Sequence, residues 1–110
     1  MRLKDAEQKG IIESFEEVFK KNNLPLAESA LYLFGSRTRD DLKGGDIDLL
    51  LRVPEAILKR VREAKTALSV AMQNRIGEQK IDLLIIDLNP PQDPFHEIAI
   101  EQAVLLKQWD

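Results

Sequence analysis

Three aspartates interrupt apolar segments of this sequence that have the composition of buried strands. Asp46 and Asp48 lie in the run DIDLLLRV, and Asp82 lies in the run KIDLLIIDL. Unpaired buried charge is costly and aspartate disfavours strands, so these carboxylates require a compensating positive charge. That charge comes either from a divalent cation or from arginines nearby in the sequence: Arg37, Arg39 and Arg52. Carboxylates that converge on one point are typical Mg²⁺ or Mn²⁺ ligands in phosphoryl-transfer chemistry.

A glycine–serine turn precedes the first two aspartates. Gly35 and Ser36 follow the apolar run SALYLF. A strand that ends in glycine before a helix start exposes N–H groups and a hydroxyl that suit phosphate. Arg37 and Arg39 come next and can neutralise further phosphate charge. A Gly-Gly pair then lets the chain turn back, so we expect Asp46 to face the glycine–serine turn. A phosphate cradle and a metal-ion cradle would then share one substrate, a nucleoside triphosphate with its magnesium.

The period of a β-strand places the two aspartates of the first run on one face. Side chains alternate along a strand, so Asp46 and Asp48 project to one side while Ile47 projects to the core. If the two aspartate-bearing strands are neighbours, Asp82 lies beside this pair. Asp87, at the end of the same run as Asp82, is an alternative third carboxylate, but its position favours the turn that follows.

Hydrophobic periodicity and capping residues predict the elements that position these groups. In chain order they are a helix over 5–21, a strand over 29–34, a strand over 46–53, a helix from Pro54 to Gly77, a strand over 80–88 and a last helix that begins at Asp93 and carries Leu105 and Leu106 on its apolar face. We therefore expect an α/β (α+β) fold, with a small mixed three-stranded sheet and helices packed on one face of it. Residues 1–110 are expected to form a single domain.

Composition and charge exclude several kinds of site. The chain has 110 residues, no cysteine and one histidine, His96, which leaves neither disulfides nor a sulfur or histidine metal cluster. A net charge of -3 argues against an extensive nucleic-acid surface. The charged N-terminal residues do not resemble a signal peptide, and no apolar run approaches the roughly 20 residues that span a bilayer. We expect a cytoplasmic protein that does not bind membranes.

Three further features have plain structural interpretations. The basic run is interpreted as the solvated face of a helix, the alternative being contact with an acidic partner or RNA; it comprises Lys59, Arg60, Arg62 and Lys65. His96 is interpreted as a surface or capping residue without a role. Trp109 is left open between an interface and the core.

At Gly-Ser-Arg-x-Arg, then Asp-x-Asp, then a single Asp on the next strand, the sequence resembles the minimal nucleotidyltransferases of the DNA polymerase beta-type superfamily. The resemblance covers almost the whole chain, to the closing EIAIEQAVLL, and implies the minimal nucleotidyltransferase fold. It implies that the triphosphate is bound by Gly35, Ser36, Arg37 and Arg39. It implies that two Mg²⁺ ions, or Mn²⁺ in their place, are held by the catalytic residues Asp46, Asp48 and Asp82.

The resemblance also implies an activity and a partner. Minimal nucleotidyltransferases often pair with a HEPN-domain protein in toxin–antitoxin modules. There the nucleotidyltransferase is the antitoxin and transfers AMP from ATP to a tyrosine hydroxyl of the toxin, a ribonuclease. We expect the same of this chain, with ATP as its substrate. Two alternatives stay open: a non-catalytic nucleotide-binding antitoxin that acts by complex formation, and a small-molecule nucleotidyltransferase of the aminoglycoside type. The sequence is compatible with an oligomer and does not define one.

Overall fold

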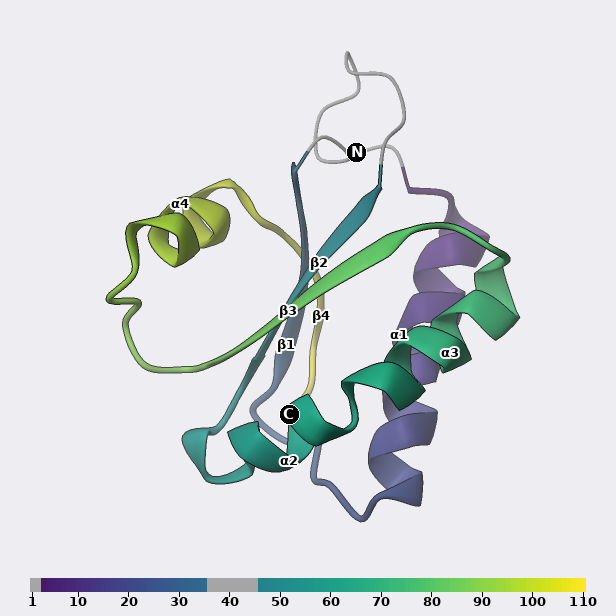
Figure 1. The fold of residues 1–110 in the computed structure, drawn as a ribbon, viewed down its shortest axis with the longest axis horizontal. Coiled ribbons are helices and arrows are strands. Elements are labelled where there is room, and N and C mark those ends of the chain that lie inside the picture. The colour runs from purple at the N-terminus through teal and green to yellow at the C-terminus, as the bar shows by residue number, and fades with distance from the viewer. Residues whose placement is uncertain (1–2, 36–45) are drawn as a thin grey trace.

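A four-stranded β-sheet forms the centre of the computed structural model, which describes residues 3–35 and 46–110 (Figure 1). Its strands are β1 (Ala30–Phe34), β2 (Ile47–Val53), β3 (Ile81–Asp87) and β4 (Val104–Gln108). The order across the sheet is β3-β2-β1-β4. β1 is antiparallel to both of its neighbours, whereas β2 and β3 run parallel. A mixed sheet combined with helices confirms the expected fold class.

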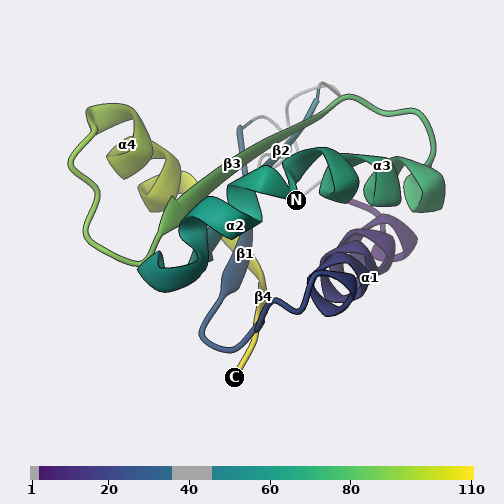
Figure 2. The ribbon, with the colours of Figure 1, turned by 60° about the horizontal axis from the view of Figure 1, so that its bottom comes forward.

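Helices cover both faces of this sheet. α1 (Asp5–Lys21) and α3 (Lys65–Ile76) pack against each other on one side, whereas α4 (Pro94–Gln102) lies on the other (Figures 1 and 2). The face under α1 and α3 is the main core, in which Phe15, Leu49 and Leu68 are fully buried. Buried apolar residues outside that core belong to the second face and to α4: Ala30, Leu50, Ile86 and Ala99. The expectation that the helices share one face is therefore wrong, because a sheet with apolar side chains on both faces must be covered on both.

The chain after α4 forms a fourth strand where the sequence predicted a helix. Helix α4 ends at Gln102, Ala103 is extended, and β4 pairs antiparallel with β1. This pairing gives β1 hydrogen-bond partners on its second edge and buries Leu106. A helix over the same residues would leave that edge of β1 open. The three-strand prediction was wrong because a short apolar run has no periodicity that separates a helix from a strand.

The long helix predicted between β2 and β3 is divided. It consists of a 3-10 turn (Glu55–Ile57), α2 (Leu58–Glu63) and α3, with Ala64 between the two helices. The apolar positions expected from the sequence are buried nonetheless: Ile57, Val61, Ala64, Leu68, Ala71 and Met72. The division lets α2 follow β3 while α3 packs against α1. Among the helices of residues 3–35 and 46–110, none is long and apolar enough to span a membrane.

Trp109 is a core residue. Its side chain is 8% exposed, and its ring centroid lies 6.4 Å from that of Phe15. Its Nε1 donates a hydrogen bond to Oε2 of Glu16 at 3.2 Å. The backbone is held as well, because Trp109 N donates to the carbonyl oxygen of Ser29 at 2.9 Å. The contacts of Trp109 therefore hold α1 against the sheet.

Replacing Trp109 by Phe keeps an aromatic ring in this place but removes the hydrogen bond to Glu16. We expect the free energy of unfolding to fall by about 1–2 kcal/mol, from the lost hydrogen bond and the smaller buried ring. Urea denaturation measures the change. Glu16→Gln keeps an acceptor oxygen for the indole N–H, so this variant should lose less stability than Trp109→Phe. An unchanged free energy of unfolding for Trp109→Phe would contradict the prediction, because the indole would then add nothing to the stability that a phenyl ring does not.

Candidate active site

The sequence Ile-Asp-Leu-Leu occurs twice, and its two copies lie side by side. Residues 47–50 of β2 pair in parallel with residues 81–84 of β3, so that Asp48 lies beside Asp82. Register partners on neighbouring strands project to the same face of a sheet. Leu49 and Leu83 are buried in the main core. Both carboxylates therefore lie on the opposite face, the one that α4 partly covers.

A row of three side chains crosses the sheet at this level. Phe34 on β1 is the register partner of Asp48, and Asp48 is the register partner of Asp82. We call Phe34, Asp48 and Asp82 the carboxylate row. The next residues on the same face are apolar, since Leu50 pairs with Tyr32 and with Leu84. The two carboxylates thus stand at the border of an apolar surface.

Gly35 closes the β1 end of the carboxylate row. It has a φ of 75°, in the left-handed region that favours glycine. A Cβ atom at this position would collide with Oδ2 of Asp48. Glycine is therefore required at position 35 for two reasons, the backbone conformation and the close approach of the Asp48 carboxylate to the backbone.

The pKa of Asp48 is raised by its surroundings in this arrangement. Burial raises the pKa of the Asp48 carboxyl above its ordinary value, and the charges of Asp82 and Asp46 raise it further. A side-chain hydrogen bond with Asp82 acts in the same direction. Each of these causes disfavours a carboxylate anion. A shifted pKa within a cluster of acidic groups is a feature of functional sites.

Lys80 offsets part of this negative charge, and the sequence analysis did not single it out. Its Nζ lies 3.3 Å from Oδ2 of Asp46. The hydrogen bond to Asp46, the charge of Asp46 and then the charge of Asp82 raise the pKa of Lys80. Lys80 stands one residue before β3 and Asp46 one residue before β2. Aligning the two Ile-Asp-Leu-Leu copies in parallel would have revealed the pair from the sequence.

Replacing Lys80 by Met is expected to raise the pKa of Asp48 further, because the charge of Lys80 lowers it in the wild type. Carboxyl-carbon NMR of the protein without nucleotide measures this titration directly. Lys59→Met removes an exposed cation from α2 and serves as the matched control. Equal titration of Asp48 in both variants would show that Lys80 does not act on this carboxylate.

The arginines proposed to offset the aspartates fall into two groups. Arg37 and Arg39, together with Ser36, lie outside the described residues, so their role stays a prediction. Arg52 lies at the far end of β2 and donates to the carbonyl oxygens of Asp87 at 3.2 Å and Asn89 at 2.9 Å. It therefore holds the turn after β3 rather than the carboxylate row. Asp87 faces that turn, as its position indicated, and its Oδ1 accepts a hydrogen bond from Asn89 N at 3.0 Å.

The basic run on α2 and α3 is more than a solvated face. Arg60 donates to the carbonyl oxygen of Asn22 at 3.1 Å. Arg62 donates from Nε and Nη2 to the carbonyl oxygen of Ile85, at 3.2 and 2.9 Å. Lys65 lines a pocket that also contains the two carboxylates of the row. Arg60 and Arg62 are therefore hydrogen-bonded to the backbone of other elements.

The donor set suits a hard divalent cation. Asp48 and Asp82 offer oxygen atoms only, which Mg²⁺ and Mn²⁺ prefer. The raised pKa of Asp48 reflects an excess of negative charge that such a cation would offset. Within residues 3–35 and 46–110, no three acidic, histidine or cysteine side chains are grouped closely enough to form a metal site. Asp46 pairs with Lys80 through Oδ2, which leaves its other carboxylate oxygen for a cation.

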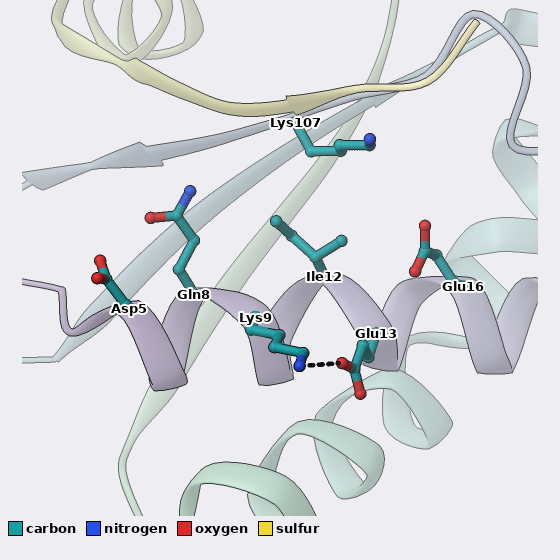
Figure 3. A pocket seen from close by; sticks show the side chains of 7 residues that line it. All are labelled: Asp5, Gln8, Lys9, Ile12, Glu13, Glu16 and Lys107. Atoms are coloured by element: carbon teal, nitrogen blue, oxygen red, sulfur yellow. Dashed lines mark ion pairs between the residues drawn. The ribbon is translucent and has the colours of Figure 1, made fainter.

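A cleft of about 490 Å³ lies on the α1 side of the sheet, between α1 and β4 (Figure 3). It is larger than the pocket that Asp48 and Asp82 line, which has about 310 Å³. The cleft is lined by Asp5, Gln8, Lys9, Ile12, Glu13, Glu16 and Lys107. Lys107 extends from β4 along one side of the cleft, and Lys9 pairs with Glu13 at 3.9 Å (Figure 3). Acidic and basic side chains are mixed here on an exposed helix face. Chemistry rather than volume therefore favours the carboxylate row as the active site.

Comparison with known proteins identifies a family for most of the chain. Residues 12–106 match a family model described as a nucleotidyltransferase domain. No curated protein matches the chain. Among solved structures, the chain is similar to a crystal structure described as that of a "putative nucleotidyltransferase" from Sulfolobus solfataricus, with 20% identity and a TM-score of 0.51 over 93% of this chain and 84% of that chain. At this identity the structural likeness concerns the fold alone.

Proposed function

Since the chain belongs to the nucleotidyltransferase domain family, we propose that it transfers AMP from ATP to a hydroxyl group of a partner protein. The observation that carries this proposal is the register pairing of Asp48 with Asp82 directly beside Gly35. Two carboxylates and a glycine turn at the end of a strand are the parts that a metal-bound triphosphate requires. General nucleotidyl transfer follows from the family, and the acceptor and the metal are our proposal.

In the proposed reaction, each aspartate and the glycine turn has its own role. The acceptor oxygen forms a bond to the α-phosphorus while the bond from that phosphorus to the bridging oxygen breaks, and pyrophosphate leaves with the electron pair. In this proposal Asp82 accepts the proton of the acceptor hydroxyl. Gly35, with Ser36, Arg37 and Arg39 as further predicted ligands, holds the pyrophosphate end. Two Mg²⁺ ions held by Asp48, Asp82 and Asp46 would neutralise the phosphate charge.

The acceptor that we propose is a tyrosine of a HEPN-domain ribonuclease toxin, which the chain would inactivate as its antitoxin. The support for this partner is the resemblance of the glycine–serine turn and the aspartates to the minimal nucleotidyltransferases, which pair with such toxins. The chemistry of the row accepts any hydroxyl that reaches the α-phosphorus. In this proposal the carboxylate row carries out AMP transfer, and the identity of the partner protein determines the biological effect of that transfer.

The direct test mixes the purified chain with a HEPN-domain partner, Mg²⁺ and ATP labelled in the α-phosphate. We expect label on the partner, and none when the label is placed in the γ-phosphate. The Asp46→Asn variant should lose transfer. A stable complex that forms without transfer of label would contradict the enzymatic proposal and favour an antitoxin that acts by binding alone.

A further inference from the structure

Four charged side chains lie together where β2 and β3 begin, and we call Asp46, Asp48, Lys80 and Asp82 the charged array. The parallel register pairs Asp48 with Asp82. Two residues earlier on each chain segment, Asp46 precedes β2 and Lys80 precedes β3. Ile47 N donates a hydrogen bond to the carbonyl oxygen of Lys80 at 3.0 Å, so the two segments are held together at this level as well. Residues two apart along a strand project to one face, so the array joins three acidic side chains and one basic side chain on one face.

The ammonium of Lys80 interacts with every carboxylate of the charged array. Its Nζ lies 3.3 Å from Oδ2 of Asp46. The hydrogen bond to Asp46 and the charges of all three carboxylates raise the pKa of Lys80. The side chains of Lys80 and Asp46 are nevertheless 72% and 42% exposed. An exposed ion pair adds little to the stability of a fold, and an exposed lysine can turn away from its partner without unpacking the core. The pair therefore matters for the charge of the site rather than for the fold.

A divalent cation at the charged array would compete with this ammonium. Asp46 uses Oδ2 for Lys80 and keeps its other oxygen, so a cation bound through that oxygen would lie beside the ammonium. Like charges at such a short separation repel each other. Among residues 3–35 and 46–110, the three carboxylates are not grouped closely enough to form a metal site, whereas the ion pair of Asp46 is closed. The charge of Asp46 is therefore offset by an ammonium of the chain itself.

A bound triphosphate would change this balance, because its proposed site lies at the same end of the sheet. β1 is antiparallel to β2, and Phe34 is the register partner of Asp48. Gly35, the next residue, therefore lies beyond Phe34 in the direction of Asp46 and Lys80. Phosphate groups at Gly35 attract both the lysine ammonium and a divalent metal. Their negative charge draws the ammonium away from Asp46 and offsets its repulsion of the metal.

We propose that Lys80 is a positioning residue that competes with a divalent cation for Asp46, and that it thereby makes metal binding depend on the nucleotide. Before the nucleotide binds, the ammonium holds Asp46 and repels the metal. The triphosphate then attracts the ammonium and supplies the negative charge that the metal requires. The two ligands are therefore coupled, and each binds more tightly in the presence of the other. This inference rests on the proposed function, since the place of the triphosphate follows from it.

The experiment uses Mn²⁺ as the probe and measures its binding to the full chain by electron paramagnetic resonance. Each titration is made without nucleotide and with α,β-methylene-ATP, which carries the triphosphate charge but cannot release pyrophosphate. Mn²⁺ bound by the analogue alone is subtracted. Without nucleotide, we expect the Kd for Mn²⁺ to be about 5-fold lower in Lys80→Met than in the wild type, because one repelling charge is gone. With the analogue, this difference should fall below about 2-fold, because the phosphates offset the ammonium.

Two control variants separate the position of Lys80 from the net charge of the chain. Lys80→Arg keeps a cation beside Asp46, so it should bind Mn²⁺ with wild-type affinity. Lys9→Met removes an exposed lysine that pairs with Glu13 on α1, and it changes the net charge as Lys80→Met does. This variant should also retain wild-type affinity, and an equal gain in both Met variants would overturn the inference. Weaker Mn²⁺ binding in Lys80→Met would overturn it too, because Lys80 would then help to build the metal site.

Lysine side-chain NMR keeps this inference distinct from the proposed function, because it requires no transfer of AMP. Mg²⁺ together with the analogue should shift the ε-carbon signal of Lys80, which is identified by its loss in Lys80→Met, and should leave the signal of Lys9 in place. An unchanged Lys80 signal would overturn the inference. Tighter Mn²⁺ binding in Lys80→Met, without AMP transfer by the wild type, would leave the inference standing and contradict the enzymatic function. AMP transfer with equal Mn²⁺ affinity in both proteins would overturn the inference alone.

Discussion

Replacing Asp48 by Asn is expected to reduce nucleotidyl transfer by about 1,000-fold or more, since a metal-binding charge at the reacting phosphate contributes several kcal/mol to catalysis. Asn has nearly the same shape, so it fits beside Gly35 as Asp48 does. What is lost is one negative charge of the row. The measurement is transfer of label from ATP to the HEPN-domain partner under conditions where the wild type labels it fully.

The same variant is expected to be more stable than the wild type at neutral pH. The folded pKa of Asp48 lies above its ordinary value of 3.8, so the folded state binds this proton more tightly than the unfolded state does. A raised carboxyl pKa stabilises the fold at pH values below the unfolded pKa, and this stabilisation is lost as the pH rises through the folded pKa. At neutral pH the ionised Asp48 is therefore a net cost, which Asn removes.

This gain is expected to be of the order of 1 kcal/mol at most, because Asp48 is only partly buried and solvent screens its charge. Urea denaturation at neutral pH and near the ordinary aspartate pKa measures it, and the difference between variant and wild type should shrink at the lower pH. Asp87→Asn is the matched control at the far end of β3, where it supports a turn, and it should retain activity. An Asp48→Asn variant that transfers AMP normally would show that the metal assignment is wrong.

Replacing Gly35 by Ala is expected to reduce transfer by at least about 100-fold, an effect of the size that a 1 Å misplacement causes. The added methyl group would collide with Oδ2 of Asp48, so the carboxylate must leave its place beside residue 35, where the phosphate is proposed to bind. The positive φ adds a cost of roughly 1–3 kcal/mol to folding for a residue with a side chain. Transfer of label and urea denaturation are measured on the same preparation.

Gly77 offers a control that separates these two effects. Its φ is 91°, so a side chain there is strained as well, but a Cβ would meet no atom within 4 Å. Gly77→Ala should therefore lose stability in the same range as Gly35→Ala while keeping its activity. If both variants lost activity equally, backbone strain rather than displacement of Asp48 would explain the result.

Much of the fold class could be predicted because its signals are local. The apolar stripe of α1 and the alternating side chains of β2 repeat with periods that a short segment reveals. The predicted helix over 5–21 agrees with α1, and the second and third predicted strands differ from β2 and β3 by one residue at the ends. The error at β4 arose because its short apolar run has no period that separates a strand from a helix, and the strand forms by pairing with β1, about 70 residues earlier in the chain.

By itself, the sequence indicated the candidate chemistry of this protein: which residues are acidic, that Asp48 alternates with the buried Ile47 and Leu49, and that a glycine precedes the aspartates. Strand period and residue type are properties of neighbouring positions, so no fold is needed to see them. Only the tertiary structure decided which charges meet. Parallel pairing of β2 and β3 joined Asp48 to Asp82 and Lys80 to Asp46. The break before α3 and the cap of α4 placed Lys65 and Phe95 in one pocket. These contacts depend on strand pairing and helix packing between distant segments, which residue type and local period do not encode.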